Sequence, residues 1–175
     1  MPSTRMRLPL CLAATAIAVC GYQPSFADTS LATPTGVAIL TVTGNISATN
    51  MGETAVFDLE MLQSYPAETF ETSTIWTEGV QSYTGVPLSE FLESLGVESG
   101  TINASAINDY TIQIPVEDDS TDSAIIAYFN NGETMSVRDK GPLWIIYPFD
   151  SRRELRSEVV YSRSIWQLDR IDITD

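Results

Sequence analysis

The sequence predicts a single α+β domain that is mostly β and contains a few short helices. Short runs of β-branched and aromatic residues, separated by turn residues, fill the second half of the chain. Only two segments show the 3.6-residue periodicity of an amphipathic helix. After removal of a predicted leader, residues 28–175 remain, a length that suits one domain with one hydrophobic core.

The N-terminus has the features of a secretory signal peptide, which we place at residues 1–27. Arg5 and Arg7 precede an apolar run of thirteen residues, and the small residue Ala27 ends the stretch that follows. The run is too short to cross a bilayer, since a spanning helix needs about 20 apolar residues. We therefore expect a periplasmic protein.

A lipoprotein is the alternative, because "IAVC" ends at Cys20. Val19 does not fit the small residue expected before a lipidated cysteine, so cleavage after Ala27 is favoured. Residues 28–36 are then expected to form a loose N-terminal arm, and residues 37–175 the domain.

The composition excludes several kinds of site. There is no His, and both Cys residues lie in the predicted leader, so the secreted chain can build no Ser–His or Cys–His pair and no imidazole or thiolate metal site. The net charge of −14 argues against nucleic acid or an anionic membrane as partner. The acidic segment 117–122 lacks the Gly and terminal Glu of an EF-hand loop, so we expect a solvated loop. The composition thus favours binding over catalysis.

The first half of the domain is predicted to hold both helices. Residues 37–44 are rich in β-branched residues and end at Gly, which predicts a strand. Residues 57–66 have Leu at helical spacing and a terminal Pro, which predicts a helix, and residues 68–76 are expected to be extended. Residues 85–96 form the clearest helix, because their apolar residues share one face between an early Pro and a final Gly.

The second half is predicted to consist of strands. Residues 101–107 and 110–116 are short strands, and the second alternates apolar with polar side chains. Residues 124–137 form a hairpin whose "NNG" tolerates positive φ in a tight turn. Two Pro residues bound a buried strand at 142–148, and residues 164–173 form a closing strand.

The cations of the secreted chain are confined to one segment. No Lys or Arg occurs between Asp28 and Val137. The seven that follow are Arg138, Lys140, Arg152, Arg153, Arg156, Arg163 and Arg170. Within "SRRELRSE" we expect the arginines to pair locally with Glu154 and Glu158 on a surface turn or short helix.

Four segments resemble the sulfite-oxidase-fold molybdopterin-binding domain of oxidoreductases. In chain order they are "IWTEGVQSYTGVPLSEFLESLG", "AINDYTIQIPVED", "IIAYFNNGETMSVRDKGPLWIIYP" and "SRSIWQLDRIDI". The resemblance covers roughly residues 37–173. It implies a sulfite-oxidase-like fold and a pocket for the pterin part of a molybdenum cofactor.

The chain departs from this family at the metal. The resemblance places Thr72 or Ser73 where the family has a molybdenum-ligating cysteine, and a hydroxyl is not a soft, ionised sulfur ligand. Lys140 and Trp144 match the family's His and Arg at the cofactor, so the guanidinium that would hold a phosphate is absent there. We therefore expect an unphosphorylated pterin without molybdenum.

In its size, predicted leader, missing cysteine and aromatic content, the sequence is similar to the periplasmic pterin-binding regulators of the PruR type. That resemblance implies a protein that is not an enzyme, holds a free reduced pterin and signals to a membrane diguanylate cyclase or phosphodiesterase. Two alternatives remain open: a molybdopterin-dependent oxidoreductase with atypical ligands, and a ligand-free adaptor module of the same fold.

A pterin needs aromatic faces and a partner for its amino and N–H edge. The resemblance assigns that edge to Asp109, although Asn-Asp is also common in turns. Trp76 and Trp144 are the stacking candidates, with a place in the core as the alternative for each, and Trp166 is assigned to the core. Glu78 is a second carboxylate close to Trp76.

Cationic and polar groups complete the predicted site. The resemblance places Arg138, Lys140 and Arg163 on the rim of the cleft, where they would complement a carbonyl, a hydroxyl or a phosphate. The predicted pterin-binding residues are Trp76, Glu78, Asn108, Asp109, Tyr110, Arg138, Lys140, Trp144, Arg163 and Ser164.

Overall fold

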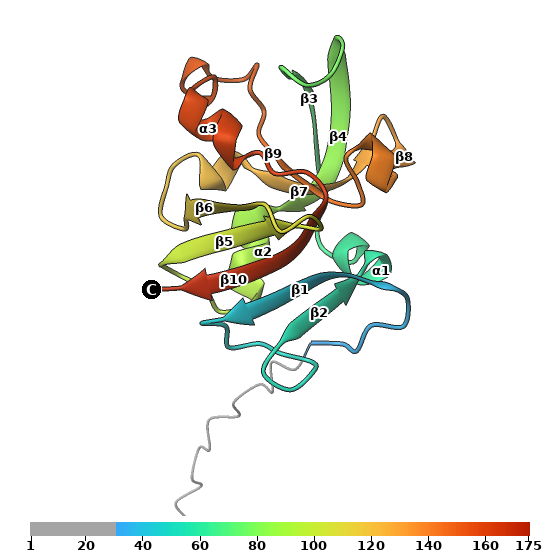
Figure 1. Cartoon of the computed structure of the whole chain (residues 1–175), viewed down its shortest axis with the longest axis vertical. Coiled ribbons are helices and arrows are strands. Elements are labelled where there is room, and N and C mark those ends of the chain that lie inside the picture. Colours follow the sequence, from blue (N-terminus) through green and yellow to red (C-terminus); the bar gives the residue numbers. More distant parts are fainter. Residues whose placement is uncertain (1–30) are drawn as a thin grey trace, which may run out of the picture.

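Two five-stranded sheets and a few short helices make up residues 31–175, which a computed structural model describes (Figure 1). The first sheet has the strand order β2-β1-β10-β5-β6. Its strands are β1 (Ala38–Gly44), β2 (Ala55–Asp58), β5 (Thr101–Ala106), β6 (Thr111–Pro115) and β10 (Leu168–Thr174). The C-terminal strand β10 lies in the centre of this sheet, parallel to β1 and antiparallel to β5.

The second sheet is antiparallel and follows the order β3-β4-β7-β8, with β9 also paired to β7. Its strands are β3 (Glu68–Ser73), β4 (Val80–Pro87), β7 (Ile125–Asn130), β8 (Glu133–Thr134) and β9 (Trp144–Ile146). Gly85 permits the close pairing of β4 with β7, because a Cβ there would lie 2.2 Å from the Ile126 carbonyl oxygen.

The helices are short. They are α1 (Leu59–Gln63), α2 (Leu88–Ser94) and α3 (Glu158–Arg163), with 3₁₀ turns at Thr121–Ser123, Val137–Asp139 and Arg153–Leu155. The apolar face predicted for α2 is confirmed, since Leu88, Phe91 and Leu92 are buried in the core. These elements confirm the predicted single α+β domain, mostly β.

Three predicted element boundaries are wrong because pairing between strands overrides local periodicity. The helix predicted at 85–96 begins at Leu88, since residues 85–87 pair with β7. The helix predicted at 57–66 begins at Leu59, after the end of β2. The closing strand begins at Leu168 rather than residue 164. The "NNG" hairpin is confirmed, with positive φ at Asn131 and Gly132.

The described part of the N-terminal arm is attached to the domain rather than loose. The backbone N–H groups of Thr35 and Gly36 donate to the Asp58 carboxylate at 2.8 and 2.7 Å. The predicted leader and residues 28–30 lie outside the described residues. Within residues 31–175, no helix has the length and apolarity needed to cross a membrane.

The arginines of the 151–158 segment do not pair with Glu154 and Glu158 as expected. Arg156 forms an ion pair with Asp150 at 2.9 Å and also donates to the Phe149 carbonyl oxygen. Arg152 donates to Ser123. The segment folds back on the residues before it, which brings other partners closer than its own glutamates.

Asp58 anchors both the arm and the start of α1. Its carboxylate also accepts from the Met61 N–H, and this hydrogen bond, with those from Gly36 and Thr35, lowers the pKa of Asp58. A lowered folded-state pKa stabilises the protein above the unfolded value of about 3.9, and this contribution disappears as the pH falls through the folded-state pKa.

We expect Asp58→Ala to lower Tm at pH 7 by roughly 2–4 °C, the shift typical of losing one modest interaction in a domain of this size. The difference from the wild type should shrink as the pH falls below about 4, because the wild-type carboxylate then becomes protonated. Thermal melts from pH 7 to pH 2.5 measure this, with Asp58→Asn as the uncharged control. A Tm difference between wild type and Asp58→Ala that stays constant from pH 7 to pH 2.5 would contradict a stabilising role of the Asp58 carboxylate.

Candidate functional site

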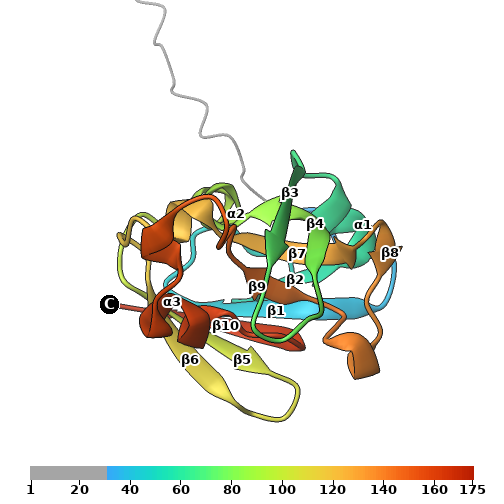
Figure 2. The same cartoon turned by 90° about the horizontal axis from the view of Figure 1, so that it is seen from above.

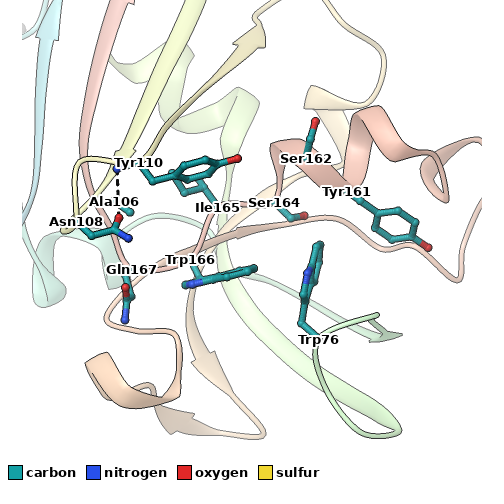
Figure 3. Close-up of a pocket in the computed structure, with 10 residues that line it drawn as sticks. All are labelled: Trp76, Ala106, Asn108, Tyr110, Tyr161, Ser162, Ser164, Ile165, Trp166 and Gln167. Atoms are coloured by element: carbon teal, nitrogen blue, oxygen red, sulfur yellow. Dashed lines mark hydrogen bonds between the residues drawn. The ribbon is translucent and has the colours of Figure 1, made fainter.

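A pocket of about 420 Å³ is lined by residues of α3, the β3–β4 loop and the β5–β6 turn. α3 and the tip of the β3–β4 hairpin stand on the same side of the first sheet (Figures 1 and 2). Three separate parts of the chain build it: the loop after β3, the β5–β6 turn, and the segment from α3 to β10. It is lined by Trp76, Ala106, Asn108, Tyr110, Tyr161, Ser162, Ser164, Ile165, Trp166 and Gln167 (Figure 3).

Trp76 forms one wall of the pocket from the loop between β3 and β4. The Thr74 hydroxyl oxygen accepts from the backbone N–H groups of Trp76 and Thr77 at 3.0 Å each, which holds the loop in a tight turn. The half-buried Trp76 ring meets the Trp166 ring at 5.6 Å and the Tyr161 ring at 5.8 Å, both edge to face. These contacts fix its orientation while part of the ring remains available to the pocket.

Trp166 lies in the pocket wall and not in the core as predicted. The segment before β10 first pairs with β9, through a bridge between Trp144 and Trp166 and a hydrogen bond from Ile145 N to Ile165 O at 2.9 Å. Gln167 then has a φ of 55° and turns the chain into β10. The alternation that suggested a single strand is therefore interrupted, and Trp166 remains half-buried at the pocket.

The β5–β6 turn contributes Asn108 and Tyr110. The turn is closed by hydrogen bonds from Asp109 N to Ala106 O and from Ala106 N to Tyr110 O, both 2.9 Å. The Asn108 side-chain oxygen accepts from Tyr110 N at 3.2 Å. Tyr110 is 57% exposed, so its ring forms the outer wall of the pocket, as Figure 3 shows.

Asp109 does not line the pocket, in contrast to the role that the resemblance assigned to it. It is the central turn residue, with a φ of 66°, and its carboxylate pairs with Arg170 at 2.7 Å. Its side chain is 88% exposed. The left-handed backbone of the turn directs the Asp109 side chain to solvent while its two neighbours face the pocket, so its alternative interpretation as a turn residue fits the structure.

Ser164 supplies a buried polar group to the pocket. It follows the last residue of α3 and is only 4% exposed. Its hydroxyl oxygen has no hydrogen-bond partner among the described residues. A buried hydroxyl without a partner costs free energy, and a ligand in the pocket can supply that partner.

Trp144 and Lys140 lie behind the pocket. Trp144 is fully buried in β9 and contacts the rings of Tyr83, Trp166 and Trp76 at 5.4, 6.0 and 6.1 Å. Trp144 therefore supports the pocket wall and is not among its lining residues, because β9 is enclosed by the core. The Lys140 ammonium lies 5.8 Å from the centre of the Trp144 ring, in a cation–π contact.

The remaining charged residues predicted for the site do not line the pocket. Arg163 pairs with Asp118 at 3.0 Å and donates to Ser120. Hydrogen bonds from Ser120, followed by the smaller effect of Arg163, lower the pKa of Asp118. Arg138 and Glu78 are exposed. Among residues 31–175, none that lines the pocket carries a formal charge.

The two hydroxyls at the position of the family's cysteine are already occupied. Thr72 is fully buried, and its hydroxyl oxygen accepts from Asp150 N at 3.1 Å. Ser73 donates to the Asp150 carboxylate through its N–H at 2.6 Å and its hydroxyl at 3.0 Å, which lowers the pKa of Asp150. Neither residue lines the pocket, so these residues do not fit the role of molybdenum ligands.

Residues 31–175 contain no group of three or more His, Cys, Asp and Glu residues arranged to hold a metal ion. The pocket instead offers aromatic rings, one buried hydroxyl and two amides. This donor set fits the pterin portion of a molybdenum cofactor, whose flat ring can stack on aromatic faces and hydrogen-bond to amides and hydroxyls.

Four of the predicted site residues line the pocket: Trp76, Asn108, Tyr110 and Ser164. Six lining residues were not predicted for the site: Ala106, Tyr161, Ser162, Ile165, Trp166 and Gln167. Four of these six are aromatic or polar residues of "YSRSIWQ", so the density of such residues in that segment was a signal for them. The pairing of this segment with β9, which brings it to the other two parts of the pocket, has no local signature.

Residues 50–150 match the family model described as the oxidoreductase molybdopterin binding domain. The match covers more than half of the chain, and the protein belongs to this family. The predicted sulfite-oxidase-like superfamily is confirmed, whereas membership of the PruR-type branch stays a prediction.

The fold resembles that of the sulfane dehydrogenase SoxCD from Paracoccus pantotrophus, with a TM-score of 0.58 and 21% sequence identity. The match covers 78% of this chain and 38% of that chain, so this chain spans well under half the length of that structure. None of the curated proteins compared matches the sequence.

Family membership corrects one prediction. The missing cysteine and the absence of His led to the expectation that the protein is not an enzyme. The family to which it belongs is one of oxidoreductase domains, and the prediction is wrong at that level. A cysteine is only one ligand of a cofactor site. Its replacement changes the metal chemistry, but the chain still belongs to the family of oxidoreductase domains.

Proposed function

We propose that the protein binds a pterin in the pocket walled by Trp76, Tyr110 and Trp166. The observation that carries this proposal is a pocket with aromatic walls and one buried, unpaired hydroxyl, in a member of a molybdopterin-binding family. Its volume of about 420 Å³ lies within the usual range for small-molecule sites, roughly 300–1,000 Å³.

The aromatic walls supply stacking surfaces for the flat ring. Stacking of a base on an aromatic side chain contributes about 1–3 kcal/mol by alanine substitution, and a pterin presents the same kind of π-face. The contacts of Trp76 with Tyr161 and Trp166 hold its ring in place before the ligand arrives. A preformed wall reduces the ordering cost of binding.

The neutral lining favours an unphosphorylated pterin. A buried phosphate is usually held by Arg or Lys through charge-assisted hydrogen bonds, and neither residue type lines the pocket. Arg163 is committed to Asp118, and Lys140 lies over the Trp144 ring. A free pterin, oxidised or reduced, has no phosphate and therefore needs no Arg or Lys in the pocket.

Ser164→Ala tests the proposal without weakening the free protein. The hydroxyl has no partner in the described residues, so its removal should leave Tm unchanged or slightly higher, while pterin affinity should fall about tenfold through loss of one buried hydrogen bond. Titration of the purified protein with pterin or a tetrahydropterin, followed by ligand fluorescence or calorimetry, measures the affinity.

Two further variants complete this experiment. Trp76→Ala should weaken binding by about tenfold or more through loss of stacking. Asp109→Asn, which suits the left-handed turn, should bind as the wild type does, because Asp109 is outside the pocket. The absence of pterin binding by the wild type would reject the proposal and favour a ligand-free adaptor of the same fold.

We also propose that the protein acts in the periplasm and signals to a membrane diguanylate cyclase or phosphodiesterase. The predicted leader and the resemblance to PruR-type regulators support this proposal. Three exposed apolar residues at or beside pocket-lining segments, Ile75, Tyr110 and Val159, offer a surface for a protein partner.

Ile75→Asp and Val159→Asp should each weaken binding to the partner's periplasmic domain, because a charge on an apolar contact must be desolvated. Surface plasmon resonance with and without pterin measures the effect, and Val37→Asp, at an exposed site near the N-terminal arm, is the control. Equal binding by the wild type and the three variants would contradict the assignment of this surface to the partner.

A molybdopterin-dependent oxidoreductase with atypical ligands is the second candidate function, and family membership is the observation that favours it. In such a protein the pocket residues would hold the pterin portion, and the cofactor would supply the redox chemistry. Metal analysis of protein purified from a molybdate-fed culture decides between the candidates. We expect molybdenum at well below one equivalent, because Thr72 and Ser73 are engaged with Asp150; one equivalent would establish the second candidate.

A further inference from the structure

Two amide side chains, Asn108 and Gln167, line the pocket at the same end, opposite Trp76 and Ser164 in the view of Figure 3. They come from different parts of the chain, Asn108 from the β5–β6 turn and Gln167 from the residue before β10. In each amide, either the side-chain oxygen or the side-chain nitrogen is hydrogen-bonded to the protein. The other atom can hydrogen-bond to a ligand.

Asn108 offers a donor. Its side-chain oxygen accepts from the Tyr110 N–H at 3.2 Å, which fixes the amide so that Nδ2 is the remaining group. Within residues 31–175, Nδ2 has no hydrogen-bond partner. A ligand beside Asn108 therefore meets two N–H donors and needs an acceptor.

Gln167 offers an acceptor. Its Nε2 donates to the Val137 carbonyl oxygen at 2.7 Å, and its backbone is held by hydrogen bonds to Lys140 O and from Ile107 N, both 3.0 Å. Its side-chain oxygen has no partner in the described part of the chain. A ligand beside Gln167 therefore meets a carbonyl oxygen and needs a donor.

We propose that Asn108 and Gln167 select a lactam edge, in which a ring carbonyl lies next to a ring N–H. This inference rests on the proposed pterin binding and adds the orientation and the chemical class of the ligand. Asn108 Nδ2 donates to the carbonyl at position 4 of the pterin, and Gln167 Oε1 accepts from the N–H at position 3. The opposite end of the ring system faces Ser164, whose hydroxyl can either donate or accept.

The lactam edge is the point at which 4-oxo pterins differ from 2,4-diaminopteridines. The diamino ring carries an amino donor at position 4 and an unprotonated acceptor nitrogen at position 3. Both positions are thus reversed, so the donor of Asn108 meets a donor and the acceptor of Gln167 meets an acceptor. A site with fixed polar groups discriminates strongly against a ligand that leaves those groups unpaired.

The experiment compares pterin with 2,4-diaminopteridine on the purified protein at pH 7.5 by fluorescence titration. The wild type should bind pterin about tenfold or more tightly than the diamino ring, because the bound diamino ring would cover Asn108 and Gln167 and leave their polar atoms unpaired. Asn108→Asp keeps the acceptor for Tyr110 N and replaces the pocket-facing donor with an acceptor. This variant should bring the affinity ratio to about one or below.

Gln113→Glu is the matched control, because it makes the same change from amide to carboxylate on the same hairpin, outside the pocket. It should keep the wild-type ratio, which separates hydrogen-bond matching from the added charge. If pterin binds but the wild type does not discriminate, or Asn108→Asp keeps the wild-type ratio, the lactam inference is overturned and pterin binding stands. If neither ring binds, both the lactam inference and the proposed pterin binding are overturned.

Discussion

The pocket depends on the path of the chain between α3 and β10. Residues 165–167 do not enter the first sheet directly. Hydrogen bonds from Ile145 N in β9 to Ile165 O, and from Leu168 N at the start of β10 to Leu143 O just before β9, hold them against the second sheet. This short segment therefore joins the two sheets. Its side chains lie where the sheets meet, and a cavity forms there because the β5–β6 turn and the β3–β4 loop stand on either side.

Behind the pocket, a layer of aromatic rings makes the walls rigid. Trp144 is fully buried and contacts both Trp76 and Trp166 in tilted or edge-to-face geometry, the arrangement that aromatic quadrupoles favour. Trp76 also contacts Phe149 and Tyr161. A ring held on several sides cannot collapse into the empty pocket. The stacking surface is consequently present before a ligand binds, and little binding free energy is lost in ordering it.

Charge is kept outside the pocket by pairing nearby. Arg170 binds Asp109 on the outer side of the β5–β6 turn, and Arg163 binds Asp118 beyond α3. Two of the clustered cations of this acidic chain thus pair with carboxylates outside the pocket, and the pocket lining keeps neutral donors and acceptors. This arrangement suits an uncharged ring. It also explains why a cationic rim around the ligand was the wrong inference from the position of the arginines.

The sequence by itself determined the class of fold, because strand alternation, the apolar face of α2 and turn residues such as those at Asn131 and Gly132 are local properties. It also determined which residue types the site could use, since His and thiolate were absent from the predicted domain. Only the tertiary structure decided which aromatic residues face the pocket. Both Trp144 and Trp166 lie in segments predicted to be strands, but one lies in an enclosed strand and the other in the segment that crosses between sheets. That difference arises from long-range pairing, and no local pattern encodes it.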